Sequence, residues 1–229
     1  MFWIALIPAY LSTIVLLVVV RESPFKHGEE ERRLPISRKD VTTLPAAFWW
    51  VILIASLLSL ARFSQAFLVL KAHDIGVDAA YVPLVLVVMY LVFSVAAYPF
   101  GILADHTDRR LQLTIGSVIL IGADVTLASA GSIWLTALGA ALWGLKLGVT
   151  QGLLGATVAD AAPERQRGTA FGIYDVAVGA GTLVASAGAG ILWGVGGPAL
   201  AFSISACIAT AAALMLAIRG QKMPHGQTK

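Results

Sequence analysis

The feature that most constrains this chain is a series of apolar segments, each long enough to cross a lipid bilayer. The hydrocarbon core is about 30 Å thick, so a spanning helix needs roughly 20 mostly apolar residues. Seven segments meet this requirement: 2–20, 46–70, 80–103, 112–131, 132–158, 169–193 and 198–218. Only 13% of the residues are charged, whereas a soluble domain carries about 25%. Since no segment alternates apolar and polar residues as barrel strands do, we predict an all-α membrane protein with seven transmembrane helices.

The lysines and arginines between these segments predict how the chain is oriented. Cytoplasmic connections of membrane proteins carry an excess of basic residues. One side of this chain holds Arg21, Lys26, Arg32, Arg33, Arg38, Lys39, Arg109, Arg110, Arg165, Arg167, Arg219, Lys222 and Lys229. The connections on the other side hold Lys71 alone. We therefore expect a multi-pass protein of the cell membrane, the inner membrane in a bacterium, with its N-terminus outside and its C-terminus in the cytoplasm.

One long hydrophilic stretch, residues 21–45, separates the first apolar segment from the other six. It mixes charges of both signs with three prolines, which is typical of a flexible cytoplasmic linker; a segment that docks a partner is the alternative. The later connections are short, so 46–218 is expected to form a tight six-helix bundle. Residues 1–20 then form a separate helix that ends a preceding unit, and 219–229 form a cytoplasmic tail.

Patterns typical of enzymes and cofactor sites do not occur in the sequence. The single cysteine, Cys207, lies inside the last apolar segment, and the four histidines are scattered without ligand spacing. We also find no glycine-rich phosphate loop, nucleophile elbow or pair of catalytic carboxylates. We therefore expect no enzymatic activity, no metal and no cofactor. Because the basic residues follow the membrane topology, the sequence pI near 9.2 does not indicate nucleic-acid binding.

Two stretches carry a resemblance to a known family. YPFGILADHTDRRLQL, residues 98–113, resembles the loop signature G-x-L-a-D-r-x-G-R-[RK] of the major facilitator superfamily. The matching residues are Gly101, Leu103, Ala104, Asp105, Arg109 and Arg110. His106 and Asp108 depart from the usual basic residue and second glycine. LWGLKLGVTQGLLGATVADAAPERQRGTAFGIYD, residues 142–175, is similar to the family's tenth helix, its P-x-x-x-R-G turn and the start of its eleventh helix.

The resemblance implies a place for this chain in a larger fold. Members have twelve helices in two six-helix bundles related by pseudo-symmetry. The segment ending LVVVRESP looks like the sixth helix, so the chain resembles helices six to twelve: one helix of the N-terminal bundle and the whole C-terminal bundle. The bacterial group that it resembles most has mostly unassigned substrates. The implied partner, besides the lipid bilayer, is another membrane protein or chain that supplies the N-terminal bundle, or a second copy of this chain.

In the family, the loop signature latches the two bundles together on the cytoplasmic side when the transporter faces outward. Gly101, Asp105, Arg109 and Arg110 are the residues to which the resemblance assigns this conformational role. An aspartate at such a position can face the N-terminus of a neighbouring helix. The arginines can bind acidic groups or helix-end carbonyls; alternatively, they mark only the topology.

Ionisable residues inside the apolar segments are the candidates for transport. Such a residue costs roughly 2.5–3.5 kcal/mol at the bilayer centre, so it is expected to face protein or water. A polar ridge along one helix is predicted from residues that recur at intervals of three, namely Ser56, Ser59, Arg62 and Gln65. We expect Arg62 to face a wet cavity; the alternative is a structural arginine that binds carbonyls of adjacent helices. Lys146 either faces the substrate or forms a buried ion pair with Asp124, which we interpret as a structural partner.

Two further candidates complete this set. Asp175 either carries a coupling proton or is satisfied by the backbone or by Arg62. Gln151 shares a helix face with Gly144, Gly148, Gly152 and Gly155, a stripe of small residues that permits close approach of another helix. The candidate substrate or coupling residues are Arg62, Gln65, Lys146, Gln151 and Asp175.

These observations favour the C-terminal half of a secondary transporter that moves a small solute by alternating access. The two cations at mid-depth favour an anionic solute, and the energy would come from a proton or solute gradient. The alternative is a membrane subunit, assembly factor or truncated remnant that binds another membrane protein without transporting. A seven-helix receptor of the retinal type is disfavoured because segment 198–218 contains no lysine for a Schiff base.

Overall fold

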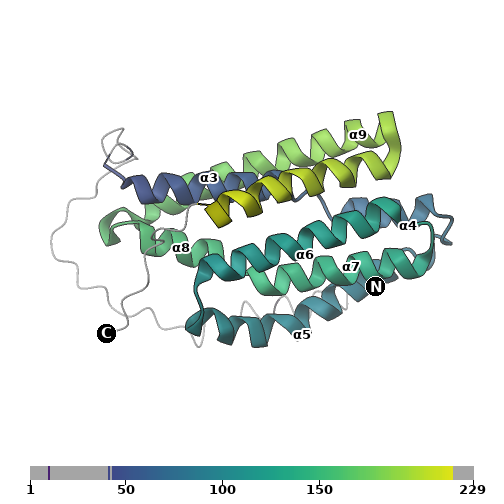
Figure 1. Ribbon diagram of the computed structural model, residues 1–229, viewed down its shortest axis with the longest axis horizontal. Coiled ribbons are helices and arrows are strands. Elements are labelled where there is room, and N and C mark those ends of the chain that lie inside the picture. The colour runs from purple at the N-terminus through teal and green to yellow at the C-terminus, as the bar shows by residue number, and fades with distance from the viewer. Residues whose placement is uncertain (1–9, 11–40, 42, 219–229) are drawn as a thin grey trace. The chain divides into compact units, whose positions relative to one another are not determined.

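The computed structural model describes Tyr10, Val41 and residues 43–218, with the side chain of Asp105 outside that description (Figure 1). The helix predicted at 1–20, nearly all of the linker and the tail therefore lie outside the described residues. Ser37–Lys229 forms one compact unit. Its described residues are mostly helical and contain no strand, as the apolar segments predicted.

The segment predicted as one helix at 46–70 is divided into two helices. α3 spans Ala46–Leu60 and begins directly after Pro45, and α4 spans Ala66–Asp74. Residues 61–65 between them are not helical. The predicted continuous helix is therefore wrong, and so is the polar ridge along it, because Arg62 lies in the break.

Contacts from distant parts of the chain stabilise this break. The oxygen of Ala61 lies 2.7 Å from the hydroxyl oxygen of Ser205, and the amide of Ser64 donates to the hydroxyl oxygen of Ser186 at 3.1 Å. These side chains replace bonds that a continuous helix would supply from its own backbone. Phe63 is buried in the break, with ring centroids 5.0–5.7 Å from those of Phe67, Trp143 and Phe202. Aromatic packing and side-chain hydrogen bonds together offset the lost helical turn.

The next two helices form a hairpin that carries the family's loop signature. α5 spans Leu84–His106 and α6 spans Arg109–Ser129. They correspond to the segments predicted at 80–103 and 112–131. Asp108 is the N-cap of α6, since its carboxylate accepts from the amide of Arg110 at 2.9 Å. The aspartate at the signature's second glycine position therefore starts the next helix.

The segment predicted as one helix at 132–158 is also divided. α7 spans Ile133–Thr150 and α8 spans Leu153–Ala161. Gly152 between them has φ 77°, in the left-handed region that glycine tolerates without steric cost. The continuous helix was a wrong prediction, because the chain turns at Gln151 and Gly152.

The last two predicted spans, 169–193 and 198–218, correspond to the two arms of one helical element on either side of Gly197. After the short 3₁₀-helix η1 (Glu164–Gln166), α9 runs over Arg167–Ile218. Gly197, with φ 71° and ψ −170°, interrupts it just before Pro198. Figure 1 shows that α9 turns back there, so that its two arms lie side by side.

Among the described residues, the segments long and apolar enough to cross a membrane are Leu84–Ala104, Arg109–Ser129, Ile133–Ala161 and Glu164–Ile218. α3 is a shorter apolar helix. The predicted count of seven helices is not reproduced helix for helix, because two of the spans are each divided into two helices and the span at 1–20 lies outside the described residues. The general prediction of a membrane protein built from several apolar helices is supported.

Close packing of small residues holds the bundle together. α5 packs on α7, α6 packs on both α7 and α9, and α3 packs on α9 (Figure 1). A Cβ atom added at Gly144 would meet the backbone of Met89, and one added at Gly148 would meet Ala96. The predicted close approach at this face of α7 is therefore confirmed at these two glycines, with α5 as the neighbour.

Candidate functional site

A cavity of about 280 Å³ lies where α3, α6, α7, α8 and α9 meet. Both helix breaks contribute to it: Arg62 comes from the break after α3, and Gln151 and Gly152 come from the break between α7 and α8. Non-helical backbone at membrane depth is tolerated where it is buried in protein or lines a cavity. The two breaks therefore place irregular backbone beside this cavity.

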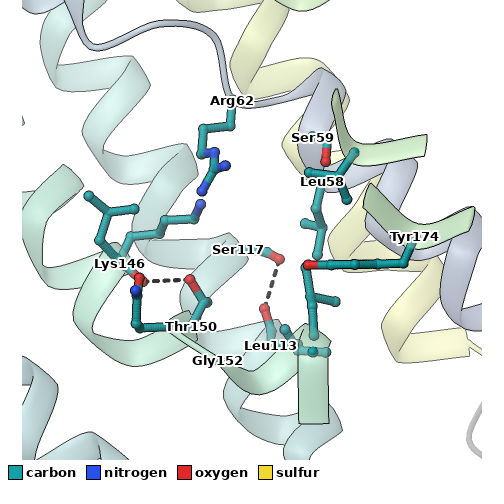
Figure 2. A pocket seen from close by; sticks show the side chains of 14 residues that line it. Leu58, Ser59, Arg62, Leu113, Ser117, Lys146, Thr150, Gly152 and Tyr174 are labelled. Carbon is teal, nitrogen blue, oxygen red and sulfur yellow. Dashed lines mark hydrogen bonds between the residues drawn. The ribbon is translucent and has the colours of Figure 1, made fainter. Parts of the chain in front are cut away.

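Two cationic side chains meet in the cavity. Figure 2 shows the guanidinium group of Arg62 and the ammonium group of Lys146 pointing toward one another. Lys146 is 7% exposed. In the part of the chain that the structure describes, neither side chain has a hydrogen-bond or ion-pair partner. Buried charges are normally paired, so this arrangement suits an anionic group bound between the two cations.

The other polar groups of the cavity offer mainly oxygen acceptors. The hydroxyls of Ser59, Ser117 and Thr150 each donate to a carbonyl of their own helix, at 2.7, 2.8 and 2.9 Å. Their hydrogens are already used in these bonds, so the three hydroxyl oxygens can only accept a hydrogen bond from a ligand. Tyr174 of α9 extends its ring into the same space (Figure 2). The side-chain hydrogen-bond donors available to a ligand are therefore Arg62, Lys146, the hydroxyl of Tyr174 and the amide of Gln151.

The five candidate residues do not all lie at this cavity. Arg62, Lys146 and Gln151 line it. Gln65 instead accepts a hydrogen bond from the hydroxyl of Tyr90 at 2.6 Å, and neither it nor the exposed Asp175 is among the lining residues.

Sequence reasoning missed Tyr174 and Ser117 as lining residues. Tyr174 is adjacent to Asp175 in the sequence, and a helical pattern alone does not say which of two adjacent side chains faces inward. Ser117 had no signal of its own, because a single serine in an apolar helix is unremarkable.

Asp124 is fully buried and is not among the residues that line the cavity. Its carboxyl oxygens accept from the indole nitrogen of Trp143 at 3.2 Å and lie 2.6 Å from the hydroxyl of Ser205. Among the described residues, Asp124 and Lys146 do not form the ion pair that we considered. Asp124 contacts its neighbours through hydrogen bonds instead.

The arginines of the loop signature are held within the bundle. Arg109 forms an ion pair with Asp160 of α8, and Arg110 donates to the carbonyls of Leu216 and Ala217 at the end of α9, the latter at 2.6 Å. These partners are of the kinds that the sequence allowed, an acidic group and helix-end carbonyls, but they belong to this bundle and not to a second one. Gly101 is exposed, and no described atom lies within 4 Å of the place where its Cβ would be.

Comparisons with known proteins agree with this architecture. The family model of the Major Facilitator Superfamily matches residues 51–229. An uncharacterized MFS-type transporter of Methanocaldococcus jannaschii is 31% identical over 214 residues, which cover 89% of this chain and 52% of the relative. The chain thus spans about half the length of the curated relative that it matches, and this relative comes from an archaeon. The chain belongs to the Major Facilitator Superfamily, a family of membrane transporters.

Proposed function

We propose that this chain is the C-terminal half of a secondary transporter that moves a small anionic solute by alternating access. The observation that carries the proposal is the convergence of Arg62 and Lys146 in one cavity without an acidic partner among the described residues. Two adjacent like charges repel each other, and a bound anion relieves that repulsion while replacing the water that the cations lose.

The cavity's other features support an anion of modest size. The first turn of α8 lines the cavity through Leu154 and Gly155. Since the N-terminus of a helix carries the positive end of its dipole, it favours a negative charge nearby. A volume of about 280 Å³ lies just below the range of about 300–1,000 Å³ that is typical of ligand pockets, which favours a small solute.

Discontinuous helices at the cavity support a transport role. In many transporters the substrate site is formed by broken helices at the interface between structural repeats. Here both breaks, one at Arg62 and one at Gly152, border the same cavity. Arg62, Lys146 and Gln151 are the residues that we assign to solute contact.

One bundle supplies one wall of a transport path, so the proposed mechanism needs a second. We assign that wall to an N-terminal bundle carried by another membrane chain, or to a second copy. The open surface of α5 at Gly101 would receive it. Asp105 would form the latch, while Arg109 and Arg110 would hold the loop in place from within this bundle.

The proposed orientation places the N-terminus outside and the C-terminus in the cytoplasm of the cell membrane, which is the inner membrane in a bacterium. Reporter domains fused after the C-terminus and inserted between α5 and α6 test it. Both reporters should be active only on the cytoplasmic side. Activity of either one on the outer side would reverse the orientation.

Uptake measurements test the transport function directly. The chain is extracted in mild detergent with whatever companion it retains and is reconstituted in liposomes. Radiolabelled acetate, benzoate, sulfate and phosphate are then offered with an inward proton gradient. We expect uptake of at least one anion, lost in Arg62→Gln and in Lys146→Gln while membrane insertion is unchanged. Arg62→Lys, which keeps a cation at the same place, should retain part of the uptake. Equal uptake by the wild type and both glutamine variants would refute the proposed site.

A further inference from the structure

The starting observation is a row of three close oxygen atoms, supplied by residues that do not line the cavity. One carboxyl oxygen of Asp124 on α6 lies 2.6 Å from the hydroxyl oxygen of Ser205 on α9. That hydroxyl oxygen in turn lies 2.7 Å from the carbonyl oxygen of Ala61 in the helix break. The second carboxyl oxygen of Asp124 accepts from the indole of Trp143 on α7 at 3.2 Å. All four residues are buried.

The number of hydrogens available to these three oxygen atoms assigns a proton to Asp124. Oxygen atoms 2.6–2.7 Å apart share a hydrogen, so each of the two contacts requires one. A serine hydroxyl has a single hydrogen to donate, and a backbone carbonyl has none. The hydrogen between Ser205 and Ala61 must therefore come from Ser205. The hydrogen between Ser205 and Asp124 must then come from the carboxyl group.

The hydrogen bond from Trp143 agrees with this assignment. It reaches the carboxyl oxygen that does not contact Ser205, which in a protonated carboxyl group is the oxygen that only accepts. Each of the four groups then has a compatible partner: Trp143 donates to Asp124, Asp124 donates to Ser205, and Ser205 donates to the carbonyl of Ala61.

We propose that Asp124 is a proton-binding site, and that the proton held there favours binding of the anionic solute between Arg62 and Lys146. The second part rests on the proposed function; the first does not. The coupling proton is thus bound by Asp124, which does not line the cavity. Asp175 is no longer the candidate for this role, because it is exposed and does not line the cavity either.

Loss of the proton would act on the cavity by two routes. The proton leaves Asp124 for water, and the hydrogen of Ser205 then turns from Ala61 to the new carboxylate. The carbonyl of Ala61 loses its partner inside the helix break, directly beside Arg62 in the chain. An unpaired buried carbonyl is costly, so the break would rearrange and displace Arg62.

The second route is electrostatic. Lys146 of α7 is the charged group that acts on the carboxyl of Asp124, and Arg62 of the break acts on Lys146. On the α9 side, Arg62 and Asp175 each act electrostatically on Tyr174. A neutral Asp124 leaves the positive charge of Lys146 available to the solute, whereas a negative Asp124 competes for it. The proton and the anion therefore bind together, and both would cross in the same direction.

Infrared spectroscopy of the purified full chain detects the proton without any solute. A protonated carboxylic acid has a carbonyl stretch that is separate from the bands of carboxylates and amides and shifts in heavy water. We expect such a band at neutral pH in the wild type and in Asp175→Asn, and its loss in Asp124→Asn. Asparagine keeps the geometry, because its amide donates to Ser205 and its oxygen accepts from Trp143. In Ser205→Ala the band should remain but shift, since the carboxyl loses its acceptor. Absence of the band from the wild type, or its persistence in Asp124→Asn, would overturn the proton assignment.

The coupling is tested separately by binding of the anions used for uptake. In the wild type, affinity should fall as the pH rises, by between about 5-fold and about 150-fold, the usual range of coupling between two sites. Asp124→Asn should bind with nearly the same affinity throughout. A wild-type affinity independent of pH, or an unchanged pH dependence in Asp124→Asn, would refute the coupling. If no anion binds at any pH while the infrared band behaves as expected, the proposed function fails and the proton site stands.

Discussion

Gly144→Ala tests whether the close approach of α5 and α7 is essential to this bundle. A Cβ atom at position 144 would lie 2.9 Å from the carbonyl carbon of Met89, 3.2 Å from its Cα, and closer still to its carbonyl oxygen. These atoms are backbone in the interior of α5, so no side-chain rotation can relieve the contact. The two helices would have to separate, and the packing along their shared face would loosen.

The expected loss of stability in Gly144→Ala follows from a comparison with Gly122→Ala on α6. At Gly122 a Cβ would meet nothing within 4 Å, so that variant gains only the higher helix propensity of alanine, about 1 kcal/mol. At Gly144 the same gain is opposed by an overpacking cost of about 1–3 kcal/mol. Because the propensity gain is common to both variants, we expect Gly144→Ala to be less stable than Gly122→Ala by about 1–3 kcal/mol.

Unfolding of the purified chain in mixed micelles, followed by tryptophan fluorescence, measures this difference. Purification yield and helix content of both variants serve as controls for insertion. Equal stability of Gly144→Ala and Gly122→Ala, or a more stable Gly144→Ala, would show that α5 and α7 do not pack as described.

Two further substitutions test the cytoplasmic loop. Asp160→Asn removes the ion-pair partner of Arg109. Because the side chains of Asp160 and Arg109 are 23% and 29% exposed, we expect the unfolding free energy to fall by no more than about 1 kcal/mol. The loss should be smaller at high salt. A larger loss that salt leaves unchanged would argue against this ion pair. Arg110→Gln removes charged hydrogen bonds to the end of α9. We expect the unfolding free energy to fall by about 1.5–3 kcal/mol and amide hydrogen exchange to become faster only in the last turns of α9. Exchange that becomes faster throughout the bundle would contradict this expectation.

The helical character of the chain was readable from the sequence because a bilayer demands long apolar segments. The positions at which those helices break could not be predicted from the sequence. The break at Arg62 depends on Ser205, which is 144 residues away in the chain, and on the burial of Phe63 among distant aromatic rings. Spacing arguments assume a continuous helix, so they placed Ser59, Arg62 and Gln65 on one ridge that does not exist.

The candidate site was predictable only in part, for a related reason. A cation inside an apolar segment is expensive, so the sequence could single out Arg62 and Lys146 without knowing the fold. Electrostatics then suggested an ion pair between Lys146 and Asp124. The structure shows that Asp124 contacts Trp143 and Ser205 instead. Hydrogen-bond partners of this kind depend on which helices are neighbours, and composition does not report that.

The loop signature illustrates the opposite case. The sequence allowed an acidic group and helix-end carbonyls as partners of Arg109 and Arg110, and groups of both kinds bind them from within this bundle. Long charged side chains at the membrane surface have few ways to satisfy their donors, so local chemistry is a good guide there. Their role in a latch stays a prediction.

The most direct test of the central claim is a structure of the reconstituted assembly with the transported anion bound. The account predicts that the negative group of the solute lies within hydrogen-bonding distance of both the guanidinium of Arg62 and the ammonium of Lys146, inside the cavity bordered by the two helix breaks. A bound solute that contacts neither cation, or a cavity in which an acidic side chain of the second bundle already pairs with both, would contradict it.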